Sequence, residues 1–177
     1  MQFSKNLSEN LEHLKQTLSL EKNFDVVYRA ITIGGKQACL LFVDGLTKDE
    51  VLLKVLQAWW SIKPENMPKD AHGFSKKYMP YGEVSLVDNE KDMIVQLLSG
   101  ITAVLVDGYD KCLMLDCRTY PARGVEEPEK DKVLRGSRDG FVETLIFNTA
   151  LIRRRIRDPK LIMEILTAGN SSHTDIA

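Results

Sequence analysis

Two β-rich runs joined by a pair of glycines commit the early part of this chain to a β-sheet. Residues 25–33 read DVVYRAITI and residues 36–43 read KQACLLFV, with Gly34 and Gly35 between them. Valine, isoleucine and tyrosine favour extended chain, and glycine tolerates the positive φ angles that a tight hairpin turn demands. The sequence therefore predicts an antiparallel hairpin over these residues.

Helical stripes of apolar residues flank this hairpin. Before it, leucines recur at helical spacing and share one side of a predicted helix, namely Leu7, Leu11, Leu14 and Leu18. That side packs either on its own domain or on a partner helix. After the hairpin, Thr47 and Glu50 have the spacing of a capping box, and an apolar stripe from Val51 to Trp59 follows them. The pattern predicts a helix from about 48 to 60, with Thr47 as its cap.

The middle of the chain combines irregular segments with short elements. Residues 61–82 contain three prolines, so we expect mostly irregular chain there, with one helical turn near 71–78. EVSLV at 83–87 predicts a short strand. A helix follows it, capped by Asp88 or Asn89 and ending at Gly100.

A second hairpin completes the predicted sheet. ITAVLV at 101–106 and CLMLDC at 112–117 are joined by a loop that opens with Asp-Gly, a common turn dipeptide. Hairpins combined with crossover helices predict an α/β chain of the α+β type. Its small mixed β-sheet carries the helices packed on it, and it is not a doubly wound parallel sheet.

Two further helices are predicted after the sheet. Ser137 can cap a helix whose apolar side runs from Phe141 to Ile156. Arginines fill the last turns of this helix, where cations interact favourably with the helix dipole; they are Arg153, Arg154, Arg155 and Arg157. Asp158-Pro159 offers a cap and a first-turn proline for another helix, predicted to end at Gly169.

The segment between sheet and helix is dense in charge of both signs. From Arg118 to Asp139 there are six basic and five acidic residues. Such a balance favours ion pairing over repulsion, but exposed pairs contribute only about 0–1 kcal/mol each. The segment is therefore either a solvated surface loop or an element that docks onto other protein.

Composition and motifs exclude several classes of function. The 177 residues carry 24 basic and 25 acidic side chains, a net charge of −1, which gives no electrostatic case for nucleic acid or an anionic membrane surface. The three cysteines form no CxxC pair, and the three histidines lie in separate regions. We therefore expect free thiols, no metal site, no cofactor and no enzymatic activity. The apolar runs are far shorter than the roughly 20 residues of a membrane-spanning helix, so we expect a soluble chain.

Three stretches together resemble a known family. They are VDGLTKDEVLL at 43–53, LLSGITAVLVDGYDKCLMLDCRTYPARG at 97–124, and DCRTYPARGVEEPEKDKVLRGSRDGFVETLIFNTALIRRRIRDPKL at 116–161. The chain resembles the A subunits of GerA-type spore germinant receptors and their sporulation relatives, over roughly residues 25–177.

This resemblance implies a larger protein than the present chain. Members of the family have a cytoplasmic N-terminal part of two small α/β subdomains and a later transmembrane bundle in the spore inner membrane. We therefore expect residues 1–136 to form the first subdomain, with an N-terminal helix and a charged loop at 117–136. Residues 137–177 would be connecting helices that lead to a second subdomain, which is missing here.

The resemblance also implies a function and partners. The first expectation is a domain for assembly or signal relay in spore germination and ion release. It would work with other subunits of a germination membrane complex, as a homo-oligomer in the full-length protein, attached to the membrane through a C-terminal region absent here. The alternative is a module that senses a small-molecule nutrient directly. The predicted docking residues are Arg118, Arg123, Glu126, Glu127, Arg135, Arg138, Asp139, Arg153, Arg154 and Arg155.

Overall fold

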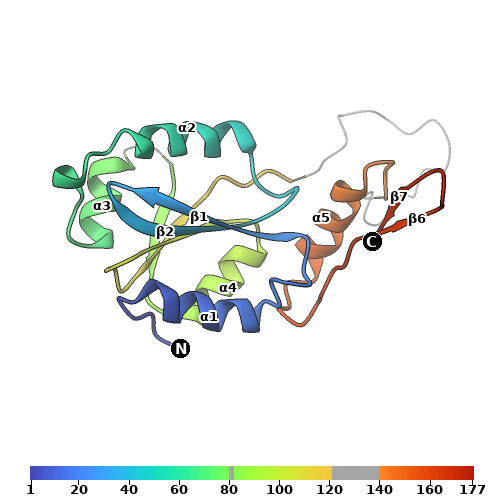
Figure 1. Cartoon of the computed structure of the whole chain (residues 1–177), viewed down its shortest axis with the longest axis horizontal. Helices are drawn as coiled ribbons and strands as arrows, with labels where there is room; N and C mark the ends of the chain where they lie inside the picture. The colour runs from blue at the N-terminus through green and yellow to red at the C-terminus, as the bar shows by residue number, and fades with distance from the viewer. Residues whose placement is uncertain (80–81, 121–139) are drawn as a thin grey trace, which may run out of the picture.

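A five-stranded sheet in the order β1-β2-β4-β5-β3 forms the centre of the computed structural model, which describes residues 1–79, 82–120 and 140–177 (Figure 1). A separate two-stranded sheet, β6-β7, lies at the C-terminal end. The elements are α1 (Leu7–Thr17), β1 (Val26–Ile33), β2 (Lys36–Val43), α2 (Asp49–Trp60), the 3-10 helix η1 (Pro64–Asn66), α3 (Ala71–Tyr78), β3 (Val84–Val87), α4 (Glu90–Leu98), β4 (Thr102–Val106), β5 (Cys112–Leu115), α5 (Leu145–Arg155), β6 (Leu166–Ala168) and β7 (Thr174–Ile176).

Both predicted hairpins are confirmed. In the first, Ile33 pairs with Lys36, and the two turn glycines have φ angles of +53° and +77°. Positive φ at both central residues is the conformation that matches the twist of the flanking strands. In the second hairpin, β4 and β5 pair antiparallel.

The predicted α+β class is confirmed, but the sheet is not mixed. All four strand pairings are antiparallel. The helix α4 does connect two strands that run in the same direction, β3 and β4. These strands are not neighbours, because β5 lies between them and is antiparallel to both. The crossover helix was therefore predicted correctly. The parallel pairing of β3 with β4 is absent because β5 is inserted between them.

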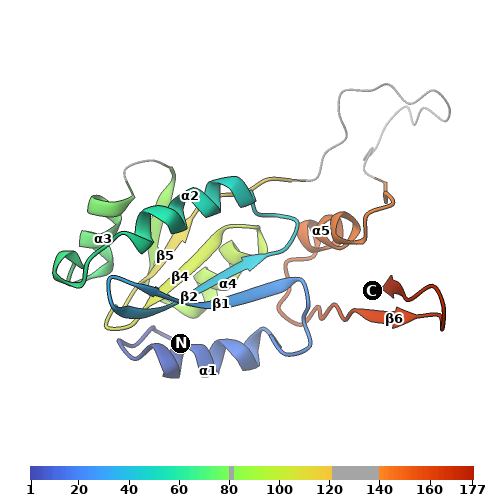
Figure 2. The ribbon, with the colours of Figure 1, turned by 45° about the horizontal axis from the view of Figure 1, so that its top comes forward.

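Helices cover both faces of the sheet. Figures 1 and 2 show α2 and α3 on one face and α1 and α4 on the other. Two buried apolar clusters correspond to these layers, one around Leu14, Leu97 and Leu105 and one around Trp59, Phe74 and Val104. The apolar sides of the first two helices therefore pack on their own domain. The leucine stripe of α1 is covered in this way, and not by a partner helix.

The three cysteines behave as small apolar residues. Cys39 and Cys112 belong to the first cluster and Cys117 to the second, and all three are free thiols. Burial raises the pKa of the Cys39 thiol to about 12 and also raises the pKa of the Cys112 and Cys117 thiols.

A buried carboxylate ties α1 to α4. Glu90 is 6% exposed and accepts a hydrogen bond from the Thr17 hydroxyl at 2.7 Å, while His13 Nδ1 lies 3.1 Å from the same oxygen. Burial alone raises the pKa of Glu90, but the hydrogen bonds from Thr17 and His13 outweigh burial and hold this pKa below its ordinary value.

In the first 100 residues, one predicted helix cap is confirmed, one is wrong, and one predicted helical turn is a complete helix. Asn89 caps α4 by accepting from the backbone N–H of Asp92 at 2.9 Å, as predicted. Thr47 does not cap α2, because its hydroxyl turns inward and donates to the Val43 carbonyl at 3.3 Å. The predicted turn near 71–78 is the complete helix α3, which Asp70 caps.

The C-terminal region departs most from expectation. The described residues 140–144 are not helical, so α5 begins at Leu145, well after the predicted cap. The helix predicted after Pro159 is absent: residues 161–165 are irregular, and the β6–β7 hairpin follows them. The physical reason lies outside this segment: the Met163 carbonyl accepts from the backbone N–H of Phe24 at 2.9 Å, which holds the chain extended beside β1. Within the described ranges, no helix has the length and apolar character needed to cross a bilayer.

Candidate functional site

A buried ion pair anchors α5 to the start of β1. Arg153 Nε donates to Asp25 Oδ2 at 2.7 Å, and Arg153 Nη2 donates to Asp25 Oδ1 at 3.0 Å. The guanidinium side chain is 0% exposed and the carboxylate side chain 1%. This two-point geometry fixes the relative orientation of the two side chains, because the guanidinium fork matches the carboxylate plane.

A single asparagine completes this anchor. Asn23 Oδ1 accepts from Arg153 Nη2 at 3.2 Å and from the backbone N–H of Met163 at 2.9 Å. Arg153 also donates to the backbone carbonyls of Leu161 at 2.9 Å and Asp158 at 3.2 Å. One buried cation therefore joins three segments: α5, the start of β1, and the chain that leaves α5.

Arg153 was predicted to dock onto protein outside this chain, and that prediction is wrong. Its side chain has no solvent exposure, and its donors bind acceptors within the chain. We name Arg153, Asp25 and Asn23 the α5 anchor. Sequence reasoning missed Asp25 and Asn23, since nothing in the local pattern links them to an arginine 128 residues away.

Close packing supports the anchor at the other end of α5. Gly45, which follows β2, has a φ angle of +77°, and a Cβ atom placed on it would lie 3.0 Å from Ala150 and from Ile146. Ala150 is fully buried and clusters with Val43 and Leu46. The helix therefore approaches the backbone after β2 as closely as a glycine permits.

A second group of side chains lies where the described chain leaves β5. The Tyr120 hydroxyl donates to the Ser99 carbonyl at 3.0 Å, and the Arg154 guanidinium lies 4.2 Å from the centroid of the Tyr120 ring. Arg118 Nε donates to Asp116 Oδ1 at 2.8 Å. This hydrogen bond lowers the pKa of Asp116 and raises that of Arg118.

The structure thus places four of the predicted docking residues. Arg153 is interior, Arg118 and Arg154 both lie beside Tyr120, and Arg155 is exposed in the last turn of α5. The other six predicted docking residues lie outside the described residues; they are Arg123, Glu126, Glu127, Arg135, Arg138 and Asp139. Ser137, the predicted cap, lies outside them as well.

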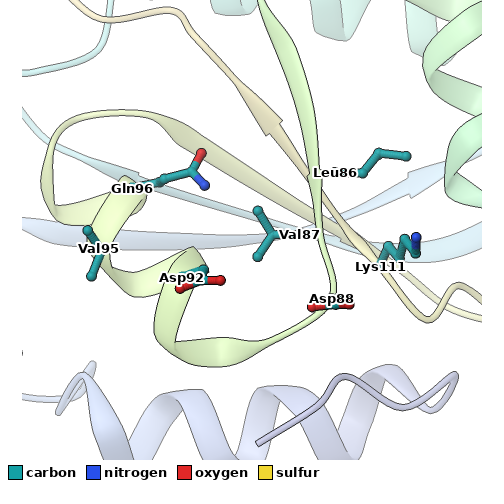
Figure 3. A pocket seen from close by; sticks show the side chains of 7 residues that line it. All are labelled: Leu86, Val87, Asp88, Asp92, Val95, Gln96 and Lys111. Carbon is teal, nitrogen blue, oxygen red and sulfur yellow. The ribbon is translucent and has the colours of Figure 1, made fainter.

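A shallow pocket of about 370 Å³ lies at the β3 edge of the sheet. Figure 3 shows its lining, which comes from β3, the residue after β3, α4 and the residue before β5: Leu86, Val87, Asp88, Asp92, Val95, Gln96 and Lys111. The Asn89 side chain donates to Asp88 Oδ1 at 3.0 Å and to Asp92 Oδ2 at 2.9 Å. The lining of the pocket therefore contains one amino group, that of Lys111, and two carboxylates that share the Asn89 amide.

Comparison with known proteins identifies the family. The model of the Bacillus/Clostridium GerA spore germination protein matches residues 12–177. Stage V sporulation protein AF of Bacillus subtilis (strain 168) is 33% identical over 98% of this chain and 35% of its own length. Spore germination protein B1 of the same organism is 33% identical over 100% of this chain and 37% of its own length. The chain thus spans little more than a third of the length of these relatives.

A solved structure shares the fold. The N-terminal domain of the A subunit of the Bacillus megaterium spore germinant receptor GerK3 superimposes with a TM-score of 0.74 at 24% identity, over 99% of this chain and 64% of that chain. The resemblance seen in the sequence motifs is confirmed by the family match, which covers most of the chain. This chain belongs to the GerA family of spore germination proteins.

Proposed function

We propose that this chain is the cytoplasmic N-terminal part of a subunit of a spore germination membrane complex, and that it acts in assembly or signal relay without catalysis. Membership of the GerA family and the fold shared with a receptor A subunit support this proposal. The complex would lie in the spore inner membrane, with this domain on the spore core side, and would release ions when it is triggered. Its partners would be other subunits, including further copies of the same protein.

The α5 anchor is the observation that carries the proposal. Coupling between distant parts of a protein travels through packed elements and hydrogen-bonded networks that move together. The pair of Arg153 and Asp25 joins α5 to the sheet with no exposed atoms on the arginine side chain. A displacement of the chain that follows α5 would therefore be transmitted to β1 through this pair. Buried ion pairs add little net stability compared with apolar residues, so a role in orientation accounts better for this one.

The exposed end of α5 supplies the docking surface of this proposal. Arg154 and Arg155 occupy the last turn of α5, and Arg154 covers the ring of Tyr120. We expect acidic groups of a neighbouring subunit to meet these arginines and Arg118.

Charge reversal in the full-length protein tests the docking role. Arg154→Glu combined with Arg155→Glu should reduce co-purification of partner subunits at least about tenfold, a loss of about 1.4 kcal/mol, and should slow germination. Arg157→Glu is the matched control, because Arg157 is exposed and its Nε donates to the Arg154 carbonyl. Normal assembly and germination in the double variant, with a protein level equal to that of the control, would refute the docking role.

The absence of catalysis is part of the proposal. The three thiols are the strongest nucleophile candidates, and burial raises the pKa of each. Thiolate is the nucleophilic form, so these groups are poorly suited to attack a substrate.

Direct nutrient sensing is the second candidate, and the pocket beside β3 favours it. Lys111 could bind a carboxylate and Asp88 an ammonium group of a small zwitterion. Titration calorimetry with amino acids and sugars would test this function, with Lys111→Ala as the control variant. Saturable binding that Lys111→Ala abolishes would favour sensing, and no heat from any of these compounds would exclude it for this domain.

A further inference from the structure

The outer edge of β1 is a long strand edge without a partner inside the described chain. β1 is the first strand in the sheet order and pairs only with β2. Its central residues Tyr28, Arg29, Ala30 and Thr32 are exposed, whereas Val26 and Ile33 at its ends are buried. An edge of this kind is a template for pairing with another strand.

The hydrogen bonds already made show which backbone groups point outward. Asp44 N–H donates to the Asp25 carbonyl at 2.8 Å, so Asp25 and every second residue after it face β2. Phe24 N–H donates in the opposite direction, to the Met163 carbonyl at 2.9 Å. The outward groups of β1 are therefore those of Val26, Tyr28, Ala30 and Thr32, and no described backbone group binds them.

The two edges of the sheet differ in how they are protected. Natural proteins protect sheet edges with short strands, prolines, bulges or several charges. At the other edge, β3 spans Val84–Val87 between Glu83 and Asp88, so it is short and flanked by charge. β1 spans Val26–Ile33, contains no proline, pairs in continuous register with β2 and carries Arg29 as its single charge. Of the two edges that this sheet has in the described residues, the β1 edge is therefore the one suited to pairing with another strand.

We propose that this edge pairs antiparallel with β1 of a second copy of the chain, about a two-fold axis through Ala30, so that one sheet continues across both copies. In this register Ala30 faces Ala30, and Tyr28 faces Thr32 of the second copy. Each facing pair uses the outward groups and can exchange two hydrogen bonds. The inference does not depend on the germination role, because it rests only on the strand geometry.

The residues of β1 select this register over its neighbours. Centring the axis on Tyr28 or Thr32 would also match the outward groups, but would shorten the overlap and place two bulky or β-branched side chains against each other. Centring it on Arg29 would also pair outward groups, those of Tyr28 and Ala30, but it would set the two Arg29 charges directly opposite each other, which is destabilising. With the axis at Ala30, the two Arg29 side chains are diagonal neighbours, about 7–8 Å apart.

The surroundings of β1 fit a second copy in charge and in space. Lys15 of α1 lies 5.3 Å from the centroid of the Tyr28 ring, and Glu12 stands one turn before it on the exposed side of the helix. The two-fold axis sets the two α1 helices antiparallel, so Glu12 of one copy approaches Lys15 of the other. The second copy also turns away at Gly34–Gly35 before its chain would reach Met163. The segment after α5 meets the β1 edge at Phe24 and then runs away from the sheet (Figures 1 and 2).

Cysteine cross-linking tests the register. Ala30→Cys places two thiols on facing residues, whose Cα atoms are about 5.5 Å apart, within the range that a disulfide spans. Thr32→Cys is the matched control, because the two Thr32 residues would lie about 14 Å apart along the strands. The native thiols are buried and should not interfere. Under mild oxidation, Ala30→Cys should form a covalent dimer at least about tenfold faster than Thr32→Cys. Equal rates would overturn the register.

The oligomeric state tests the pairing itself. Light scattering after size exclusion should give the mass of a dimer for the unmodified chain, at concentrations of tens of micromolar. Thr32→Lys, which sets a lysine beside Tyr28 and Lys15 of the second copy, should give a monomer with an unchanged circular dichroism spectrum. Ala30→Pro, which removes an outward N–H at a sheet edge where proline is tolerated, should do the same. A monomeric unmodified chain would overturn the proposal, as would a folded Thr32→Lys variant that remains dimeric.

Discussion

Arg153→Ala is expected to be the most destabilising single truncation in the α5 anchor. The Asp25 side chain is 1% exposed in the intact pair, and the truncation removes both N–H groups of Arg153 that donate to its carboxylate. Removing one partner of a buried pair costs about 3–5 kcal/mol, because the remaining charge stays desolvated. Leu161 keeps a 3.5 Å contact from the Asn23 amide, but the Asp158 carbonyl loses its donor from Arg153. We therefore expect a loss of about 4 kcal/mol, which corresponds to a fall in Tm of roughly 8–16 °C for a domain of this size.

Urea unfolding followed by tryptophan fluorescence would measure this loss. Arg157→Ala is the control and should cost less than about 0.5 kcal/mol, because Arg157 is exposed. The double variant Asp25→Leu with Arg153→Met should recover more than half of the loss, since two apolar residues of similar size can replace a buried pair. If Arg153→Ala costs no more than Arg157→Ala, the pair is not buried in solution and the role of the anchor in orientation is refuted.

Three further outcomes are expected. Gly45→Ala should lower the free energy of unfolding at least about 1 kcal/mol more than Gly82→Ala, because both glycines have positive φ but only Gly45 has α5 against it; equal losses in urea would show that α5 does not press there. The pKa of Glu90 is lowered on folding, so its contribution is complete above about pH 4.5 and is lost as pH falls through the lower folded value. Glu90→Gln should therefore flatten the acid side of the stability profile, and an unchanged slope would count against this. Ellman's reagent at pH 8 should label no thiol in the folded chain within minutes, in line with the pKa of about 12 for Cys39; fast labelling would disprove the burial.

Local patterns predicted the elements whose signal is contained in residues that are neighbours in sequence. The hairpin at Gly34–Gly35, the leucine stripe of α1 and the Asn89 cap of α4 were all found this way. The predictions that failed concern residues whose partners are distant. Thr47 had the right spacing for a cap, but it lies in a β-bridge with Arg118, 71 residues further along the chain, and its hydroxyl donates to the Val43 carbonyl instead.

The candidate site was predicted only in part for the same reason. The arginines at the end of α5 were found as a group, yet the sequence could not show that Arg153 points inward while Arg154 covers Tyr120. The helix expected after Pro159 failed because Arg153 and Phe24 take the carbonyls of Leu161 and Met163. Tertiary hydrogen bonds overrode a sound local propensity there.

The insertion of β5 between β4 and β3 has a consequence for how the chain acquires its structure. β3, once synthesised, cannot join the earlier strands until the residues up to Leu115 are present, because β5 lies between β3 and β4. The buried ion pair of Asp25 forms later still, because Arg153 lies 128 residues further along the chain. Such non-local closures slow folding, so a chain interrupted before either closure would expose apolar strands to aggregation.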